Sequence, residues 1–160
     1  MNSGVLDRMI RHVLSGKGAH VEASAVFDGL RWKLAGVRPR GVSHSAFQLL
    51  NHMTYWQEWA VRWLDGEHPA IPKHASGSWP GGEALTTAAD WRRTIKRFRK
   101  GLSDLERRSR DEDLFTKSGA KTRLEMLRAI GSHNSYPAGQ VALLRQMLDS
   151  WPPPSGGLTW

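Results

Sequence analysis

The chain has 160 residues, a formal net charge of +8 at pH 7 and no cysteine. This length is typical of one domain, residues 1–160, and the lack of cysteine excludes disulfides, thiol nucleophiles and cysteine-ligated metals. No apolar run reaches the roughly 20 residues that a membrane-spanning helix needs. The first 14 residues carry charges and a histidine where a signal peptide has an apolar core. We therefore expect a cytoplasmic protein that does not cross a membrane.

Helical periodicity recurs along the first 64 residues. Apolar residues spaced by three and four predict a helix over residues 3–14, with the inward side chains Leu6, Met9, Ile10, Val13 and Leu14. A poorly periodic helical stretch follows over residues 20–34 and is compatible with one helix or with two shorter pieces. A longer helix is predicted over residues 43–64. Its apolar face consists of Phe47, Leu50, Met53, Trp56, Ala60 and either Trp63 or Leu64.

Residues 66–82 have no periodic pattern and are rich in glycine and proline. A helix of about 22 residues is about 33 Å long, whereas about 17 extended residues reach up to about 55 Å. The segment can therefore return to the starting end of the helix, so we expect a long crossover. The next helix, residues 85–108, would then run parallel to the last. Its inward positions are Ala88, Trp91, Ile95, Phe98, Leu102 and Leu105.

The last predicted helix covers residues 121–150, after a polar connection at residues 111–120. Its apolar stripe consists of Leu124, Leu127, Ile130, Val141, Leu144 and Leu148. Prolines at 152–154 end it, because proline cannot continue a helix. No alternation of useful length predicts a β-strand. The sequence therefore predicts an all-α fold, a bundle of four main helices with an extra short helical segment after the first helix.

Two histidines lie on the apolar faces of long predicted helices, His52 in the 43–64 helix and His133 in the 121–150 helix. Helix bundles commonly hold metal ions with inward side chains of facing helices. A single inward histidine is more often a hydrogen-bonded core residue than a ligand. A pair on facing helices favours a metal site more strongly, but two ligands are fewer than the three or four of tight zinc sites.

Four segments together resemble the DinB-like (YfiT-like) superfamily. They are residues 50–56 (LNHMTYW), 133–140 (HNSYPAGQ) with 143–145 (LLR), 151–157 (WPPPSGG) and 38–41 (RPRG). The resemblance covers essentially the whole chain, and the 151–157 tail is its most specific part. It implies a four-helix bundle with up-down-down-up connectivity and a homodimer. It also implies three histidines around a divalent metal, one on the second main helix and a His-x-x-x-His pair on the last.

Carried over by position, His52 matches the first family ligand and His133 the second, whereas Pro137 stands where the third is expected. Proline has no side-chain donor atom, and it removes the helix hydrogen bond to the carbonyl of His133. We therefore expect a degenerate centre that binds metal weakly or not at all, beside a kink in the helix. Alternative third ligands are His20, Glu58, Gln140 or a histidine of the neighbouring loop, and the sequence does not decide between them.

The resemblance implies a metal-dependent enzyme of the thiol-dependent transferase or hydrolase type. Its cofactors would be a divalent metal, zinc or nickel, and a low-molecular-weight thiol. The expected pocket lies around the two histidines, among Trp56, Trp59, Asn134 and Gln140. The alternative is a metal-free, non-catalytic bundle that binds a small apolar ligand or acts through dimerisation.

The predicted helix over residues 85–108 has a basic outer face, which could indicate nucleic-acid binding. This face consists of Arg92, Arg93, Lys96, Arg97, Arg99 and Lys100. A charged outer face is also what an ordinary bundle helix needs in water. No recognition-helix motif, glycine-rich phosphate loop or aromatic-basic repeat accompanies it. The sequence therefore favours a solvated face over a nucleic-acid-binding surface.

Overall fold

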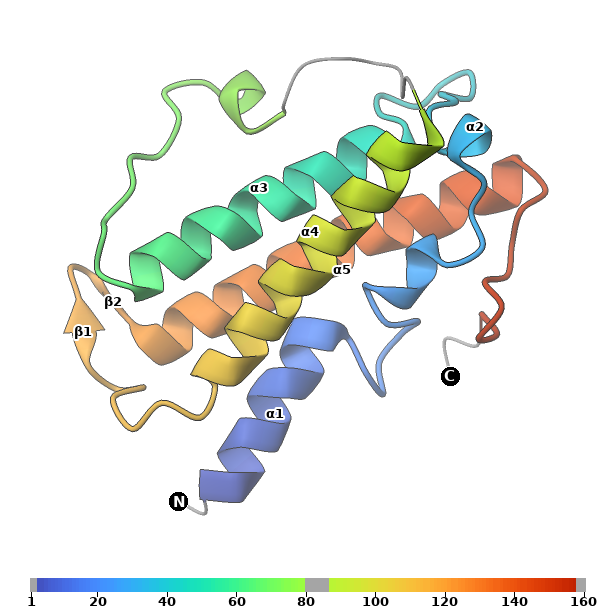
Figure 1. The fold of residues 1–160 in the computed structure, drawn as a ribbon. Coiled ribbons are helices and arrows are strands. Elements are labelled where there is room, and N and C mark those ends of the chain that lie inside the picture. The colour runs from blue at the N-terminus through green and yellow to red at the C-terminus, as the bar shows by residue number, and fades with distance from the viewer. Residues whose placement is uncertain (1–2, 80–86, 158–160) are drawn as a thin grey trace.

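The computed structural model describes residues 3–79 and 87–157. Within these residues the chain forms five α-helices and one two-stranded antiparallel hairpin (Figure 1). The elements are α1 (Ser3–Ser15), α2 (Trp32–Ala35), α3 (Ala46–Leu64), α4 (Ala88–Arg108), β1 (Lys117–Ser118), β2 (Lys121–Thr122) and α5 (Arg123–Met147). The predicted all-α class is confirmed, because helices contain most of these residues. None of the described helices combines the length and apolar character needed to cross a membrane.

Side-chain caps set where α3 and α5 begin. The Ser45 hydroxyl accepts the backbone N–H of Gln48, and the Gln48 side chain accepts the backbone N–H of Ser45. Thr122 and Glu125 form the same reciprocal pair before α5. Such capping boxes satisfy N–H groups that the first turn leaves unpaired. Both helices therefore start two or three residues later than their apolar periodicity predicts.

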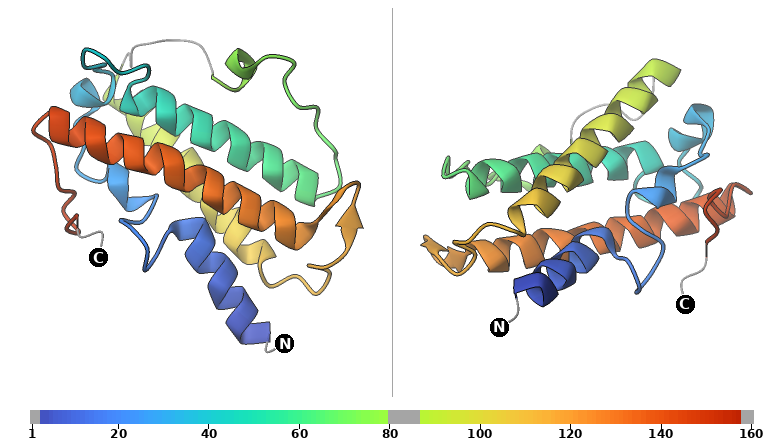
Figure 2. Two further views of the ribbon diagram at one scale, coloured as in Figure 1. Left: turned by 180° about the vertical axis from the view of Figure 1, so that it is seen from behind. Right: turned by 60° about the horizontal axis from the view of Figure 1, so that its bottom comes forward.

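Helices α4 and α5 each pack against α3, and α4 crosses it at an angle (Figures 1 and 2). Glu58 of α3 pairs with Arg97 of α4 at 2.8 Å, and Asp65, which follows α3, pairs with Arg108 at the end of α4 at 2.6 Å. Because the residue numbers of these partners rise together, α3 and α4 run in the same direction. Figure 2 shows α5 beside α3, running in the opposite direction.

Residues 66–79 return along the outside of α3 (Figure 1). The Trp59 indole N–H donates to the carbonyl of Ala70 at 3.1 Å, and further on His52 Nδ1 lies 3.0 Å from the carbonyl of Ser78. The segment thus passes first the end and then the beginning of α3. Residues 80–82 of the predicted crossover lie outside the described residues, so the crossover as a whole stays a prediction.

The stretch at residues 20–34 is not one helix. It contains a 3-10 turn at Ala25–Phe27, a separate irregular piece, and then the four-residue α2. Gly29 between them has φ +70, a left-handed conformation that interrupts a right-handed helix. Val26, Phe27 and Leu30 are nevertheless buried. Of the two possibilities that the sequence left open, the structure shows the shorter pieces, and the weak periodicity reflects an irregular segment that fills the core.

The short hairpin of β1 and β2 was not predicted. Each strand has two residues, which is too short for an alternating pattern to be visible in the sequence. Gly119, at φ +65, lies in the turn between them. The hairpin belongs to the polar connection between α4 and α5, which otherwise consists of turns around Leu114.

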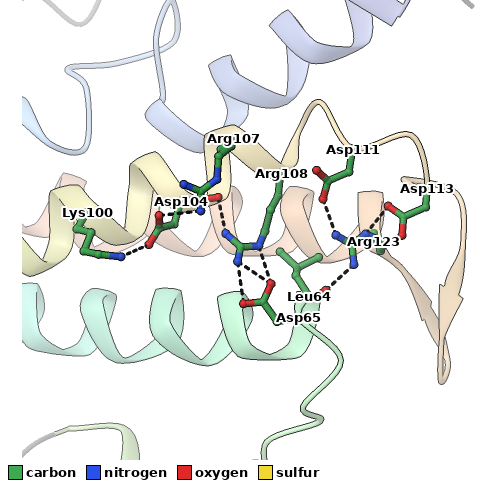
Figure 3. Close-up of polar contacts among 9 residues, drawn as sticks. All are labelled: Leu64, Asp65, Lys100, Asp104, Arg107, Arg108, Asp111, Asp113 and Arg123. Carbon is green, nitrogen blue, oxygen red and sulfur yellow. Dashed lines mark hydrogen bonds and ion pairs between the residues drawn. The ribbon is translucent and has the colours of Figure 1, made fainter.

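Ion pairs tie together the ends of three helices at this side of the molecule (Figure 3). Arg123, the first residue of α5, pairs with Asp111 and Asp113 and donates to the carbonyl of Leu64 at the end of α3. Arg108 of α4 pairs with Asp65 beside it. Because solvent reaches the carboxylates of these pairs, each pair contributes little, about 0–1 kcal/mol. Together they hold the connection between α4 and α5 against the end of α3.

The buried apolar residues form two clusters along the bundle. One holds the start of α3 and the second half of α5, and the other holds α1, the end of α3 and the first half of α5. Gln57, Gly101 and Asn134 lie between residues of the two clusters on α3, α4 and α5 respectively. Gln57 and Asn134 have no exposed surface. Two buried polar side chains, those of Gln57 and Asn134, therefore lie between the two apolar clusters near the middle of the bundle.

Helix α1 buries a narrower face than its periodicity predicts. Ile10 and Leu14 are buried, whereas Met9 and Val13 are exposed. The helix crosses α4 and α5 at an angle, so that one edge of it contacts them (Figure 2). At the crossing, a Cβ on Gly131 of α5 would lie 2.6 Å from the backbone oxygen of Val13. The close approach of α1 therefore depends on the absence of a side chain at Gly131.

We expect Gly131→Ala to lower the free energy of unfolding by about 1–3 kcal/mol, because the added methyl meets backbone that cannot rotate away. Gly139→Ala on the same helix is the matched control, since no atom lies within 4 Å of the Cβ it would add. That change should leave stability unchanged or raise it by up to about 1 kcal/mol, because alanine favours helix over glycine. Urea denaturation measures both, and equal effects would contradict the close packing of α1.

Candidate metal centre and adjoining cavity

The structure brings His52 of α3 and His133 of α5 into direct contact. Their Nε2 atoms are 3.2 Å apart, and the two rings are tilted by 48° with centroids 5.0 Å apart. Both side chains are half-buried. The two histidines that helical periodicity placed on inward faces therefore do meet, at the line where α3 and α5 pack.

Hydrogen bonding fixes the tautomer of His52. Its Nδ1 lies 3.0 Å from the carbonyl oxygen of Ser78, which can only accept, so in the neutral ring Nδ1 carries the proton. Nε2 of His52 then presents a lone pair to His133. A neutral His133 that carries its proton on Nε2 can donate a hydrogen bond to this lone pair. Alternatively both lone pairs can face one cation, since two imidazoles on a tetrahedral zinc at 2.0–2.1 Å stand about 3.3 Å apart.

Aromatic stacking holds the His52 ring in place. Trp79, from the returning segment, lies between two imidazoles, at 3.9 Å from the ring centroid of His52 and 3.8 Å from that of His44. The Trp56 ring packs in T-shaped arrangements with the rings of both His52 and His133. Apolar periodicity could not reveal His44 or Trp79, because both lie outside the long helices.

His133 is less firmly oriented than its partner. Its Nδ1 is buried and makes no hydrogen bond of standard geometry within the described residues, and the same holds for both amide atoms of Asn134 and of Gln57. Metal-binding histidines usually donate their second ring N–H to a carbonyl, a carboxylate or water. His52 has such a partner in Ser78, whereas no carbonyl or carboxylate in residues 3–79 and 87–157 accepts from His133 Nδ1 at standard geometry.

A third protein ligand is missing from the part of the chain that the structure describes. Pro137 is buried one turn beyond His133, and α5 continues through it as one helix. No group of three or more His, Cys, Asp or Glu side chains in residues 3–79 and 87–157 is placed to hold an ion. The donor set is thus two imidazoles. It does not fit a tight divalent metal site, for which three or four protein ligands are typical.

Three of the alternative third ligands considered from the sequence are engaged elsewhere. His20 Nδ1 donates to the carbonyl of Val21 at 2.7 Å, and its Nε2 lies 3.0 Å from the Ser135 hydroxyl. Glu58 forms a bidentate pair with Arg97 on the surface. Gln140 lines a separate cavity of about 190 Å³ together with His44. None of the three side chains completes the centre in this arrangement.

An apolar cavity of about 290 Å³ adjoins the histidine pair. Its lining consists of Trp56, Trp59, Ala60, Ile71, Lys121, Met126, Ala129, Ile130 and His133. Of the residues expected around the pocket, Trp56 and Trp59 line this cavity. Asn134 is fully buried in the core, and Gln140 lies at the other cavity. Ile71, which the sequence did not single out, reaches the cavity because Trp59 holds its neighbour Ala70.

Burial lowers the pKa of both His52 and His133, and their neighbours His44 and His52 lower these pKa values further. As the pH falls below the usual value of about 6.5, the unfolded chain binds protons that the folded chain still excludes. The free energy of unfolding should therefore fall between pH 7.5 and 5.5, since stability declines where the unfolded state binds more protons. Urea denaturation across this range measures it.

Replacing His133 with glutamine should make that pH dependence shallower. His12, which is exposed on α1, provides the matched control as His12→Gln. An unchanged pH dependence in the His133 variant would show that the pair stays accessible to protons in the folded chain.

Comparisons of the chain with protein-family models, with curated proteins and with solved structures found no match. The resemblance to the DinB-like superfamily therefore stays a prediction from the sequence. The geometry of the histidine pair and of its cavity carries the functional argument.

Proposed function

We propose that this chain is a DinB-like bundle with a degenerate metal centre, and that its cavity binds a small, largely apolar molecule. The observation that carries the proposal is the contact of His52 with His133 at 3.2 Å on the wall of an apolar cavity, with proline where a third ligand would stand. The pair supplies two nitrogen atoms, and Trp56 and Trp59 supply aromatic walls. Pockets of this kind commonly combine an apolar lining with few polar groups.

The proposal includes the up-down-down-up order of the DinB-like superfamily. It is supported by the common direction of α3 and α4 and by the opposite direction of α5 (Figures 1 and 2). The return of residues 66–79 along α3 supports a crossover as the connection between α3 and α4.

A second candidate is a metal-dependent enzyme of the thiol-dependent transferase or hydrolase type. The Nε2 spacing of His52 and His133 and the carbonyl of Ser78 on His52 Nδ1 favour it. These two histidines would hold zinc or nickel, and a divalent cation there would stabilise the thiolate form of a low-molecular-weight thiol. The chain itself would contribute the cavity wall and exclude water. Such an enzyme needs a third donor from outside this pair.

Apolar side chains exposed on two helices support a homodimer, which stays a prediction. Met9 on α1 and Tyr136, Leu143 and Met147 on α5 are exposed, Tyr136 by 75%. Light scattering at micromolar concentration should give twice the 18.0 kDa of one chain. A mass of 18.0 kDa would contradict the dimer. The cytoplasmic location likewise stays a prediction.

The basic face of α4 gives little support to nucleic-acid binding. Arg97 pairs with Glu58, and Lys100 pairs with Asp104. Arg99 pairs with an acidic residue as well. Paired cations are less available to phosphates than an uncompensated stripe. The face is therefore better described as a solvated helix surface.

Titration with 4-phenylbutan-1-ol, followed by calorimetry, tests the ligand-binding proposal. This neutral probe should bind saturably to the native chain, and Trp59→Ala should weaken binding by about tenfold or more because one aromatic wall is lost. Trp32→Ala is the matched control, since Trp32 lies on α2 and does not line the cavity. No saturable binding to the native chain, or equal losses in the two variants, would contradict the proposal.

A further inference from the structure

We propose that the cavity ligand is a small carboxylic acid with an apolar ring or branched alkyl body, and that Lys121 binds its carboxylate. The inference rests on the proposed ligand-binding function and names the chemistry of the ligand. It is drawn from the sign of the charge at the cavity, from the position of that charge, and from the size and lining of the remaining space.

The polar side chains at the cavity are few and their placement is asymmetric. Lys121 and His133 are the two polar side chains in the described lining, and the other lining residues are apolar. His133 lies ten residues into α5, which corresponds to about 15 Å along the helix from its first residue. Lys121 precedes that first residue. The cavity wall along α5 therefore has an ammonium at one end, an imidazole at the other, and Met126, Ala129 and Ile130 between them.

The ammonium group of Lys121 is not neutralised by any acidic side chain that the structure describes. It is exposed, and no ion pair between Lys121 and an acidic side chain is found within residues 3–79 and 87–157. Glu125, the nearest acidic residue along the chain, is engaged with the backbone N–H and hydroxyl of Thr122. Lys100, by contrast, pairs with Asp104 on α4. The described cavity lining contains no acidic side chain that would compete for Lys121, so a bound anion would be attracted to its ammonium group.

The apolar part of the cavity sets the body of the ligand. The rings of Trp56 and Trp59 meet edge-to-face at 5.7 Å, and Ile71 of the returning segment lines the same cavity. Ile71 is 68% exposed, so a bound ring would bury apolar surface that now faces water. A volume of about 290 Å³ is at the small end of ligand pockets. It suits a phenyl-sized or bicyclic body rather than a long acyl chain.

Three probes of one shape and different charge test the inference: 4-phenylbutanoate, 4-phenylbutan-1-ol and 4-phenylbutylamine, titrated by calorimetry at low ionic strength. The native chain should bind the carboxylate about two- to fivefold more tightly than the alcohol, which corresponds to an exposed ion pair. The amine should bind more weakly than the alcohol. Added salt should reduce the preference for the carboxylate, since exposed charges are screened.

Substitutions at Lys121 assign the effect to one side chain. Lys121→Gln should remove the preference, and Lys121→Glu should reverse it in favour of the amine. Lys117→Gln is the matched control, because it removes the same charge from the same hairpin without changing the cavity lining. That variant should keep the preference for the carboxylate.

The outcomes separate this inference from the function on which it rests. Equal affinity for the carboxylate and the alcohol in the native chain, or a preference that survives in Lys121→Gln, would overturn the role of Lys121 while leaving apolar binding intact. Binding of none of the three probes would instead contradict the proposed function itself. A loss of the preference in Lys117→Gln would show that overall charge, and not the cavity, selects the ligand.

Discussion

Replacing Pro137 with histidine should raise the affinity for zinc or nickel by at least about hundredfold, since loss of even a partner of a ligand typically costs 10–100-fold. Position 137 lies one turn from His133 on α5 and is buried. A histidine there would add a third imidazole to the two that already meet at 3.2 Å. Three protein ligands with an open position are the usual set of a catalytic zinc site. Competition with a chelating dye measures the affinity.

Pro137→Ala is the control that separates the ligand from the helix. Both substitutions restore the N–H that proline lacks, and a proline inside a helix costs about 3 kcal/mol relative to alanine. Both variants should therefore form a more stable α5, whereas only Pro137→His should gain metal affinity. Adding His52→Ala to the histidine variant should abolish the gain. Equal metal affinity in the alanine and histidine variants would show that position 137 does not face the centre.

Replacing Arg145 with methionine should lower the free energy of unfolding by about 3 kcal/mol or more, because several buried carbonyls would lose their donor. Arg145 is 2% exposed. It donates to the carbonyls of Val26 and Asp28 at 2.7 and 2.8 Å, and to that of Ser150 at 2.6 Å. Its guanidinium also lies 5.9 Å from the Trp151 ring. One side chain thus joins α5, the irregular segment after α1 and the C-terminal tail.

Arg128→Met on the same helix is the matched control, since Arg128 is exposed. It should change stability by no more than about 0.5 kcal/mol, as is usual for surface substitutions. Arg145→Lys should fall between the two, because an ammonium cannot span carbonyls on both sides as a guanidinium does. Urea denaturation measures all three. A loss below about 1 kcal/mol in Arg145→Met would show that water replaces the guanidinium.

The sequence predicted the helices that have strong periodicity and a single buried face. Trp91, Phe98, Leu102 and Leu105 of α4 are buried as expected. Residues 20–34 were harder to interpret, because their apolar side chains fill the core from irregular backbone and have no helical spacing. The exposure of Met9 on α1 could not be predicted either. It depends on the angle at which α1 crosses its neighbours, and local spacing does not encode that angle.

The site could be predicted only in part, because periodicity locates residues on regular helices and not those on irregular segments. His52 and His133 stand on long helices, so periodicity placed both on inward faces. Their surroundings come from a segment without periodicity, which contributes the Ser78 carbonyl, the Trp79 ring and Ile71. Whether such a segment folds back over α3 depends on contacts distant in sequence.

The central claim is that two histidines without a third ligand bind divalent metal weakly. Mass spectrometry of the native chain, purified without added metal or chelator and then dialysed, tests it most directly. Zinc and nickel should be present at well below one ion per chain. One ion per chain after dialysis would mean that another group completes the centre; this would contradict the degenerate site and favour the metal-dependent enzyme.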